Sequence, residues 1–303
     1  MTRAAARSAL VVGAGGAVGE AVAHALLDVG WRVTATMRRL HAPAAARLAA
    51  RGVRLLPLAL EAPAGLARDL AGVSGVVFAP ILTLSVKAAP LVAQAGVERA
   101  VFFSSNNVAV DPGDPIYAAL AEAEREALAI LPQATILRPT LIYGERRLPT
   151  LPRLMRLMRR TPVFPVPGSG RALQQPVFHK DLARAAAAAL LLEEAVGKIY
   201  AIGGPDQLSL AALYRAVARA AGGPQVILPT PVWLLNLARR FVSVPLDAAQ
   251  LKRVEEDKRA VPADPPPPEL AARTPLAEGL TQLAADLSAA SETQAWRGRR
   301  RPA

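Results

Sequence analysis

The chain has 303 residues, of which 52% are hydrophobic, so it can bury the core of one large domain or of two lobes, and disorder is excluded for most of it. The absence of cysteine excludes disulfides, thiolate metal sites and cysteine nucleophiles, and three scattered histidines do not indicate a zinc site, so we expect no metal. A net charge of +12 permits an anionic partner. With 4% aromatic residues and no recognisable nucleic-acid module, however, we expect no nucleic acid.

The first forty residues read as strand, glycine turn, helix and strand. An apolar run at 9–12 precedes the turn, an amphipathic helix continues to about residue 27, and a second strand is expected at 31–37. In a dinucleotide-binding βαβ unit the glycines allow a tight turn, close approach of a pyrophosphate and close packing of the helix, whose N-terminus faces the phosphates. The cofactor-binding residues predicted here are Gly13, Gly15, Gly16, Ala17, Val18 and Gly19.

Two arginines, Arg38 and Arg39, follow the second strand, where a unit that prefers NAD usually places an acid on the ribose 2′-hydroxyl. A carboxylate would repel a 2′-phosphate, whereas a guanidinium can bind it through two hydrogen bonds. We therefore favour NADP(H) over NAD(H) as the cofactor. The alternative, in an arginine-rich chain, is that both are solvated surface side chains.

Strand and helix signals continue to alternate, with further strands expected at 53–56, 75–78, 100–103 and 134–137 and one more at 198–202. This rhythm predicts an α/β fold with a Rossmann-type, doubly wound parallel sheet. Ligands of such sheets bind beyond the carboxyl ends of the strands. The strand-end residues predicted to line the cofactor site are Ala79, Pro80, Ser104, Pro139 and Thr140.

The pattern changes in the second half of the chain. We expect residues 1–143 to form the cofactor-binding domain, completed by about 181–205, and residues 144–180 with 206–290 to form a small, mostly helical C-terminal lobe. Residues 291–303 read as a basic, disordered tail. No apolar run reaches the ~18–20 residues needed to span a bilayer, so we expect a cytoplasmic protein.

Two segments of the lobe, 152–160 and 231–241, are basic and amphipathic. Each could dock on an acidic membrane surface, which would place the protein at the inner face of the membrane, or on a partner protein. The alternative is that both belong to the substrate lobe, with the apolar side inward and the arginines in water.

Several motifs occur in a fixed order along the chain. They are the glycine turn, Phe-Phe-Ser-Ser at 102–105, Ile-Leu-Arg-Pro-Thr-Leu-Ile-Tyr-Gly at 136–144, Gln-Pro-Val at 175–177 with Asp-Leu-Ala at 181–183, and Tyr-Ala-Ile-Gly-Gly-Pro at 200–205. Together they resemble the extended and atypical short-chain dehydrogenase/reductases. The closest-looking branch includes bacterial NAD-dependent epimerase/dehydratase proteins and the NAD(P)H-binding accessory subunit of mitochondrial complex I. A late segment, 255–258, is similar to that branch as well, and the resemblance covers about residues 8–285.

The resemblance implies a small lobe over the nicotinamide and a catalytic Tyr-x-x-x-Lys pair with a nearby Ser or Thr. Tyr117 matches the tyrosine, and Asn106 aligns with the serine, with Ser105 beside it, so these three are the catalytic candidates. The chain departs from the pattern at Ala121, which occupies the position of the lysine. Without that lysine, Tyr117 is either a proton donor supported by another group or a half-buried packing residue.

Other departures and substitutes follow from the same comparison. The acid that often contacts adenine after the third strand is missing, with Ala59 there. Arg125, Lys180 or Tyr143 could take over part of the proton transfer.

Two functions fit this pattern. The first is an NADP(H)-binding enzyme with reductase or epimerase chemistry on a small molecule that the sequence does not identify. The second is a catalytically silent NADPH-binding sensor, or a scaffold subunit of a larger complex such as a membrane-associated respiratory one. The missing lysine favours the second function, whereas the complete glycine turn favours ligand binding in both.

Overall fold

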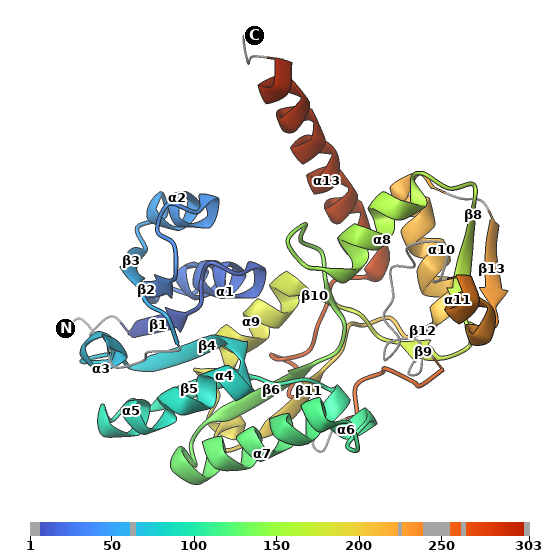
Figure 1. The fold of residues 1–303 in the computed structure, drawn as a ribbon. Coiled ribbons are helices and arrows are strands. Elements are labelled where there is room, and N and C mark those ends of the chain that lie inside the picture. Colours follow the sequence, from blue (N-terminus) through green and yellow to red (C-terminus); the bar gives the residue numbers. More distant parts are fainter. Residues whose placement is uncertain (1–6, 61–64, 224–225, 239–254, 262–264, 300–303) are drawn as a thin grey trace. The chain divides into compact units, whose positions relative to one another are not determined.

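The computed structural model describes residues 7–60, 65–223, 226–238, 255–261 and 265–299 (Figure 1). The chain divides into two compact units. Unit 1 comprises residues 1–140, 179–203 and 260–272, and unit 2 comprises residues 141–178, 204–259 and 273–303. No helix in the described part of the chain has both the length and the apolar character that a bilayer crossing requires.

Unit 1 is built on a seven-stranded sheet in which every neighbouring pair of strands is parallel. The strand order is β11-β6-β5-β4-β1-β2-β3, so the order reverses between β1 and β4. The predicted doubly wound sheet is therefore confirmed, and its reversal point is where such sheets open a crevice for ligands. The strands are β1 (Ser8–Val12), β2 (Arg32–Met37), β3 (Arg54–Pro57), β4 (Gly75–Ile81), β5 (Arg99–Phe103), β6 (Thr135–Pro139) and β11 (Ile199–Ile202).

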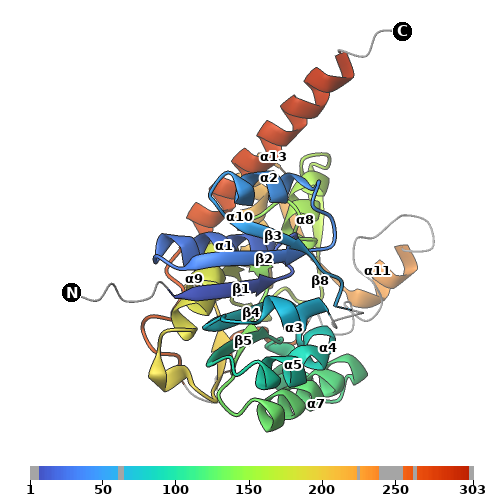
Figure 2. The ribbon, with the colours of Figure 1, turned by 90° about the vertical axis from the view of Figure 1, so that its left-hand side faces the viewer.

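Helices follow nearly every strand and cover both faces of this sheet (Figure 2). Because side chains alternate along a strand, Leu10, Phe78 and Phe102 point to one face, where they form a core with α3, α4, α5 and α7. Helices α1 and α9 contact each other and pack on the opposite face. The helical elements are α1 (Ala17–Asp28), α2 (Pro43–Ala49), α3 (Leu66–Asp69), α4 (Leu82–Ser85), η2 (Val86–Ala88), α5 (Ala89–Gln94), α6 (Asn107–Val110), α7 (Pro115–Ile130), α9 (His179–Ala189) and η3 (Glu193–Ala195).

A late segment, 260–272, returns to unit 1, although we expected all of 206–290 to lie in the C-terminal lobe. Side chains of unit 1 hold this segment by its backbone. The Arg184 guanidinium donates to the carbonyl oxygens of Glu269 (2.8 Å) and Ala271, and Leu270 is fully buried. Such long-range contacts leave no periodic trace in a sequence.

Unit 2 combines helices with three two-stranded sheets, β7–β10, β8–β13 and β9–β12. Its core brings the apolar sides of α8, α10 and α13 together around Tyr143 and Tyr214. Burial raises the pKa of Tyr214 to about 12, so this side chain stays neutral at physiological pH. The elements are β7 (Ile142–Tyr143), α8 (Thr150–Met158), β8 (Val163–Pro167), β9 (Leu173–Gln174), β10 (Val177–Phe178), β12 (Leu208–Ser209), α10 (Leu210–Ala221), β13 (Val226–Thr230), α11 (Val232–Ala238) and α13 (Leu276–Arg299).

The C-terminal segment does not follow the expectation of a disordered tail from residue 291. Helix α13 continues to Arg299. Residues 300–303, the rest of the expected tail, lie outside the described residues.

Candidate functional site

The glycine turn begins where β1 ends. Gly13 has a φ of +84°, which favours glycine. Its N–H and that of Ala14 both donate to the Thr36 carbonyl oxygen, at 3.0 and 2.9 Å, and so tie the turn to β2. A Cβ at Gly13 would lie 2.7 Å from Pro80 Cδ, too close for any side chain. The turn is therefore closed on one side by β2 and on the other by the end of β4.

The remaining glycines divide into two kinds. A Cβ at Gly19 would lie 2.5 Å from the Gly13 carbonyl oxygen, so this glycine lets α1 pack directly on the turn. A Cβ at Gly16 would lie 3.6 Å from its nearest neighbour, and one at Gly15 would lie 3.4 Å from Met37 Cβ. The packing of the protein tolerates side chains at these last two positions, and their absence keeps the backbone of the turn open.

Helix α1 begins at Ala17, with Gly16 as its N-cap and without a side-chain cap. Its first intrahelical hydrogen bond runs from Glu20 N to Gly16 O (3.0 Å), so the N–H groups of Ala17 and Val18 precede the intrahelical ladder. Uncapped donors at the positive end of a helix suit a phosphate. The turn and the first N–H groups of α1 thus have a geometry that fits the pyrophosphate of a dinucleotide.

Arg38 and Arg39 follow β2 directly and are both exposed. Met37, the last residue of β2, lies against the glycine turn at Gly15, so the arginines leave the strand beside that turn. Among the described residues neither guanidinium forms an ion pair, and β2 is followed by no acid. Both charges are thus available at the edge of the predicted site.

Ala79 and Pro80 at the end of β4 act on the turn as packing groups. Pro80 is the wall against Gly13, and the Ala79 methyl group faces Gly19, where a Cβ would lie 2.9 Å away. The Ser85 hydroxyl donates to the Pro80 carbonyl oxygen (3.0 Å) and fixes this strand end. These contacts belong to the geometry of the turn, and they could not be read from the order of residues.

The end of β5 places three polar residues in different surroundings. The Ser104 hydroxyl is buried and has no hydrogen-bond partner in the described structure. The Ser105 hydroxyl accepts from Asn107 N (3.2 Å). Asn106 is buried, and its side-chain oxygen accepts from Val261 N (2.9 Å) on the segment that returns to unit 1. Of the three residues, Ser104 therefore carries the unsatisfied hydroxyl, which fits a polar ligand group.

Strand β6 ends next to this point. Asn106 N donates to the Pro139 carbonyl oxygen (3.0 Å), and Ser104 N donates to that of Leu137 (2.9 Å). Thr140 is half-buried and donates from its N–H to the Ile202 carbonyl oxygen (3.1 Å). The predicted strand-end residues Ser104, Pro139 and Thr140 are thus brought together at one edge of the sheet.

Tyr117 is the third residue of α7, behind the N-cap Asp114, whose carboxylate accepts from Ile116 N (2.8 Å). Its ring packs against the core of unit 1, as does Ala121 one turn later. Its phenol oxygen accepts a hydrogen bond from Asn107 Nδ2 (2.7 Å). Asn107 belongs to the polar Ser-Ser-Asn-Asn run after β5 and was not predicted as a partner of Tyr117.

The other groups considered for proton transfer are placed elsewhere. Arg125 pairs with Glu122 on the exposed side of α7. Tyr143 belongs to unit 2, is buried, and packs so closely on α13 that a Cβ at Gly279 would lie 2.5 Å from its hydroxyl oxygen. Its position in the core of unit 2 makes it a packing residue.

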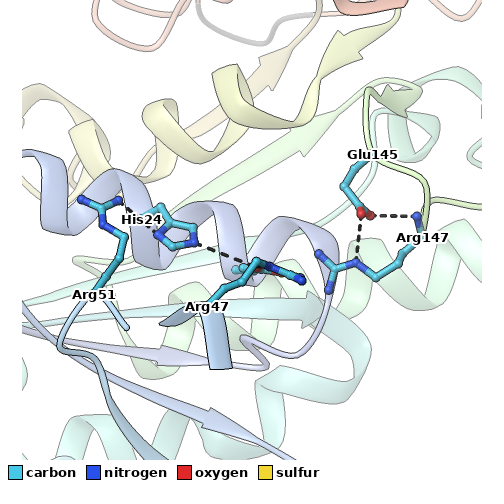
Figure 3. Close-up of polar contacts among 6 residues, drawn as sticks. His24, Arg47, Arg51, Glu145 and Arg147 are labelled. Atoms are coloured by element: carbon cyan, nitrogen blue, oxygen red, sulfur yellow. Dashed lines mark hydrogen bonds and ion pairs between the residues drawn. The ribbon is translucent and has the colours of Figure 1, made fainter. Parts of the chain in front are cut away.

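Ion pairs fix the helices behind the site. The buried Glu20 carboxylate on α1 accepts two hydrogen bonds from Arg47 on α2, at 2.5 and 2.9 Å (Figure 3). Next to it, Arg51 lies 3.1 Å from His24 Nδ1 and 2.7 Å from Asp28 Oδ1. Burial, and then the charge of Arg51, lower the pKa of His24 below 6.5. These contacts hold α2, and with it the loop that carries Arg38 and Arg39.

A second bidentate pair lies on the other side of the sheet. The Arg138 guanidinium on β6 donates to both carboxylate oxygens of Glu124 on α7, through Nε at 2.8 Å and through Nη2. Both side chains are largely buried, so the pair fixes α7 against the sheet. In unit 2 a smaller local pair closes the turn after β7, where the Glu145 carboxylate accepts from Arg147 N (2.8 Å) and Nε (3.0 Å) (Figure 3).

Metal chemistry finds no support in the described residues, which contain no group of three or more His, Asp or Glu side chains arranged around a common point.

Comparison with known proteins agrees with this geometry. The sequence profile of the NmrA-like family matches residues 6–222. Over 112 residues the chain is 34% identical to the NADH dehydrogenase (ubiquinone) 1 alpha subcomplex subunit 9, mitochondrial, of Arabidopsis thaliana. That match covers 37% of this chain and 28% of the relative, so the chain matches less than a third of the relative's length.

Several solved structures share the fold. An NADPH-dependent quinone oxidoreductase from Escherichia coli superposes with a TM-score of 0.67 at 21% identity, over 91% of this chain and 99% of that one. A triphenylmethane reductase from Citrobacter sp. gives 0.70 at 21%, over 92% and 99%. A UDP-glucuronic acid 4-epimerase from Bacillus cereus gives 0.71 at 14%, over 93% and 99%. At these identities the likeness concerns the fold.

Proposed function

This chain belongs to the NmrA-like family, a branch of the atypical short-chain dehydrogenase/reductases, and on that premise we propose that it binds NADPH and reduces a small organic acceptor. The observation that carries the proposal is the pair of exposed arginines, Arg38 and Arg39, at the end of β2 beside the open glycine turn. A guanidinium there would bind a 2′-phosphate, and no carboxylate follows β2 to bind a 2′-hydroxyl instead.

The residues that would hold the cofactor follow from the fit described above. The glycine turn and the first N–H groups of α1 suit the pyrophosphate, and the buried Ser104 hydroxyl at the end of β5 is a donor for a polar group of the cofactor or the acceptor. When bound, NADPH would supply a hydride. The similarity in fold to the Escherichia coli quinone oxidoreductase and the Citrobacter triphenylmethane reductase supports conjugated acceptors such as quinones as the first compounds to test.

We favour reduction over epimerisation because of the surroundings of Tyr117. Reduction of a carbonyl or quinone needs a group that gives a proton, and a neutral phenol can do this. Epimerisation of a sugar also needs a group that takes a proton from a hydroxyl, for which the phenolate must be stabilised by a cation. Ala121 supplies no ammonium group, and Asn107 supplies a neutral hydrogen bond (2.7 Å) to the phenol oxygen.

The binding part of the proposal is tested by the affinities of the intact chain for NADPH and NADH. We expect NADPH to bind more tightly, and Arg38→Ala to weaken NADPH by at least about tenfold while NADH changes little. The matched control is Arg54→Ala, because Arg54 is exposed at the amino end of β3, away from the strand ends that form the site. Equal losses for both cofactors in Arg38→Ala would contradict the assignment of the 2′-phosphate to this arginine.

The catalytic part is tested by NADPH oxidation over a panel of quinones, triphenylmethane dyes, aldehydes and ketones. We expect turnover with at least one conjugated acceptor, and a loss of roughly 100-fold in kcat for Tyr117→Phe with an unchanged NADPH affinity. Turnover that Tyr117→Phe leaves intact would show that the acceptor takes its proton from another source.

A second function is favoured by two observations. Ala121 replaces the lysine of the family's pair, and the Asn106 side-chain oxygen is engaged by Val261 N, so two positions of the usual catalytic set serve packing. The Arabidopsis relative is named as a subunit of a NADH dehydrogenase. Tight NADPH binding without turnover on the whole panel would favour a silent sensor or scaffold subunit over the reductase.

A further inference from the structure

The two-stranded sheet β8–β13 has an unusual outward face. Phe164, Val166 and Ile227 point inward and join the core of unit 2. The alternate positions, which are normally polar on a half-exposed sheet, are Val163, Pro165, Val226 and Leu228, and all four are exposed. The parallel register sets Val163 opposite Val226 and Pro165 opposite Leu228, so the apolar residues form directly neighbouring pairs. This face is apolar across both strands.

Helix α11, which begins two residues after the end of β13, also exposes apolar side chains. Leu235 is buried and Val232 packs against the core, so the inner side of the helix is anchored on unit 2. Its remaining large side chains face solvent, with Trp233 68% and Leu237 45% exposed. All the exposed large hydrophobic side chains of the described part of unit 2 lie on β8, β13 and α11. They are Val163, Val226, Leu228, Trp233, Leu234 and Leu237, which we call the apolar patch.

The segments that carry the apolar patch contain basic residues and no acidic ones. The chain carries no Asp or Glu between residues 146 and 180 or between 207 and 246, and these stretches contain β8, β13 and α11. Arg160 is exposed and lines the same surface hollow as Val163 and Val226. An acid, Glu255, lies at the other end of β8, where its carboxylate accepts from Ser169 N, and Gly168 N there donates to Thr230 O of β13, two residues before α11.

Helix α8 shows what a buried amphipathic segment looks like in the same unit. Its apolar residues Leu151, Leu154, Met155 and Met158 are buried, and its arginines 153 and 156 face water. The apolar side of segment 152–160 therefore packs in the core of unit 2. The described part of 231–241 instead exposes apolar side chains to solvent. Residues 239–241 lie outside the described residues. The two segments, alike in sequence, have different uses.

We propose that the apolar patch inserts into the headgroup region of an anionic membrane. The patch offers the two contributions that hold a peripheral protein on such a surface: apolar side chains that can be buried among the lipids, and a basic group, Arg160 beside Val163 and Val226, that is attracted to anionic headgroups. Tryptophan also prefers the interface between water and lipid. A protein partner of this patch would have to be acidic and apolar at once, whereas an anionic bilayer has both properties everywhere.

The test is co-sedimentation of the full chain with vesicles. We expect binding to phosphatidylcholine vesicles that contain phosphatidylglycerol, weaker binding to phosphatidylcholine alone, and loss of most binding when salt is raised to about 0.5 M. The double substitution Trp233→Ser with Leu237→Ser should lower the partition coefficient by more than about tenfold. Arg160→Glu should lower it by at least about fivefold.

Matched controls separate the patch from the general properties of the chain. Val29→Ser removes a side chain that is 55% exposed on unit 1, and Arg54→Glu makes the same charge change on unit 1; both should bind vesicles as the unchanged chain does. An unchanged NADPH affinity and thermal midpoint would show that the patch variants are folded.

Fluorescence identifies the inserted residue. Trp31 is buried, so in a Trp296→Phe background the exposed tryptophan that responds to lipid is Trp233. We expect its emission to shift to shorter wavelength and to be quenched by brominated lipids, and Trp233→Phe should abolish the response. Failure of the folded chain to bind anionic vesicles at low salt, or binding that the double variant retains, would overturn the proposal. A lipid-free dimer that the double variant dissociates would also overturn it, because the patch would then cover a second copy.

Discussion

Unit 1 contains two adjacent regions that are built in opposite ways. The nucleotide end, residues 13–19 with Arg38 and Arg39, is shaped by missing side chains, since Cβ atoms at Gly13 and Gly19 would lie 2.7 and 2.5 Å from neighbouring atoms. The β5–α7 end, residues 104–107 with Tyr117, is shaped by side-chain hydrogen bonds such as Asn107 to Tyr117 and Asn106 to Val261. At Gly13 and Gly19 there is no room for a side chain, whereas hydrogen-bond partners can be replaced one at a time.

This difference explains how the chain combines a complete glycine turn with an altered catalytic set. An alanine in place of the lysine, as at Ala121, leaves a packed position on α7. A substitution at Gly13 or Gly19 would instead displace β4 or α1. Retention of binding with changed chemistry is thus the expected course of divergence on this scaffold.

The largest effect should come from the ion pair that fixes α7, the helix of the β5–α7 end, to β6. Removal of Arg138 leaves the Glu124 carboxylate buried without its cation, and we expect Arg138→Ala to lower the free energy of unfolding by about 3 kcal/mol. The comparison is Arg47→Ala at the nucleotide end, where Arg47 is half-exposed and water can replace it, with an expected loss of about 1 kcal/mol. Urea denaturation at pH 7 measures both losses. Equal losses would mean that the two pairs are solvated alike.

The two kinds of glycine provide the next test. Gly19→Ala would push α1 away from the turn and should lower the free energy of unfolding by about 2 kcal/mol, with loss of NADPH binding. Gly16→Ala fits the protein and should change stability by less than about 0.5 kcal/mol, yet lower NADPH affinity at least about tenfold. Calorimetric titration and thermal unfolding separate the two outcomes. A Gly16→Ala variant that binds as tightly as the unchanged chain would place the phosphates elsewhere.

Asn107→Ala tests whether the β5–α7 end retains chemistry. If its amide supports the phenol oxygen of Tyr117, its loss should lower kcat by about five- to tenfold, without changing the NADPH affinity or the thermal midpoint. The pH dependence of kcat is the additional readout, because a positioning group of the proton donor shifts that profile and a packing residue does not. An unchanged kcat together with an unchanged profile would reduce Asn107 to a structural role.

The smallest effect concerns His24 at the nucleotide end. Its pKa is lowered in the folded state by burial and by Arg51, so the unfolded chain binds a proton more readily. The contribution of His24 to the free energy of unfolding is therefore present above pH 6.5 and is lost as the pH falls below that value. His24→Gln should flatten this acid slope in urea denaturation, and an unaltered slope would assign it to other groups.

The sequence predicted those features that depend only on residues close together in the chain. All seven strands of the sheet were predicted within a few residues, because buried parallel strands are short apolar runs between glycine and proline signals. The functions of Gly13 and Gly19 also followed from their spacing, since a tight turn and a close helix are properties of the segment itself. The placement of Arg38 and Arg39 followed from the end of β2.

Contacts between segments far apart in the chain could not be predicted from the sequence. The residues near Asn106 do not indicate that its side-chain oxygen accepts a hydrogen bond from a backbone N–H more than 150 residues later. The partner of Tyr117 was missed because α6 must fold back on α7 before Asn107 can reach it. Residues 152–160 and 231–241 share one pattern, and the packing of unit 2 alone buries the apolar side of the first and exposes Trp233 of the second.

The sequence by itself therefore determined the parallel sheet, the glycine turn and the two cations at its edge, because backbone sterics and hydrophobic periodicity act over a few residues. The tertiary structure decided which polar groups at the strand ends are satisfied and which remain available, and which amphipathic face is buried. The physical reason is that hydrogen-bond satisfaction and burial depend on atoms brought together from segments far apart in the chain.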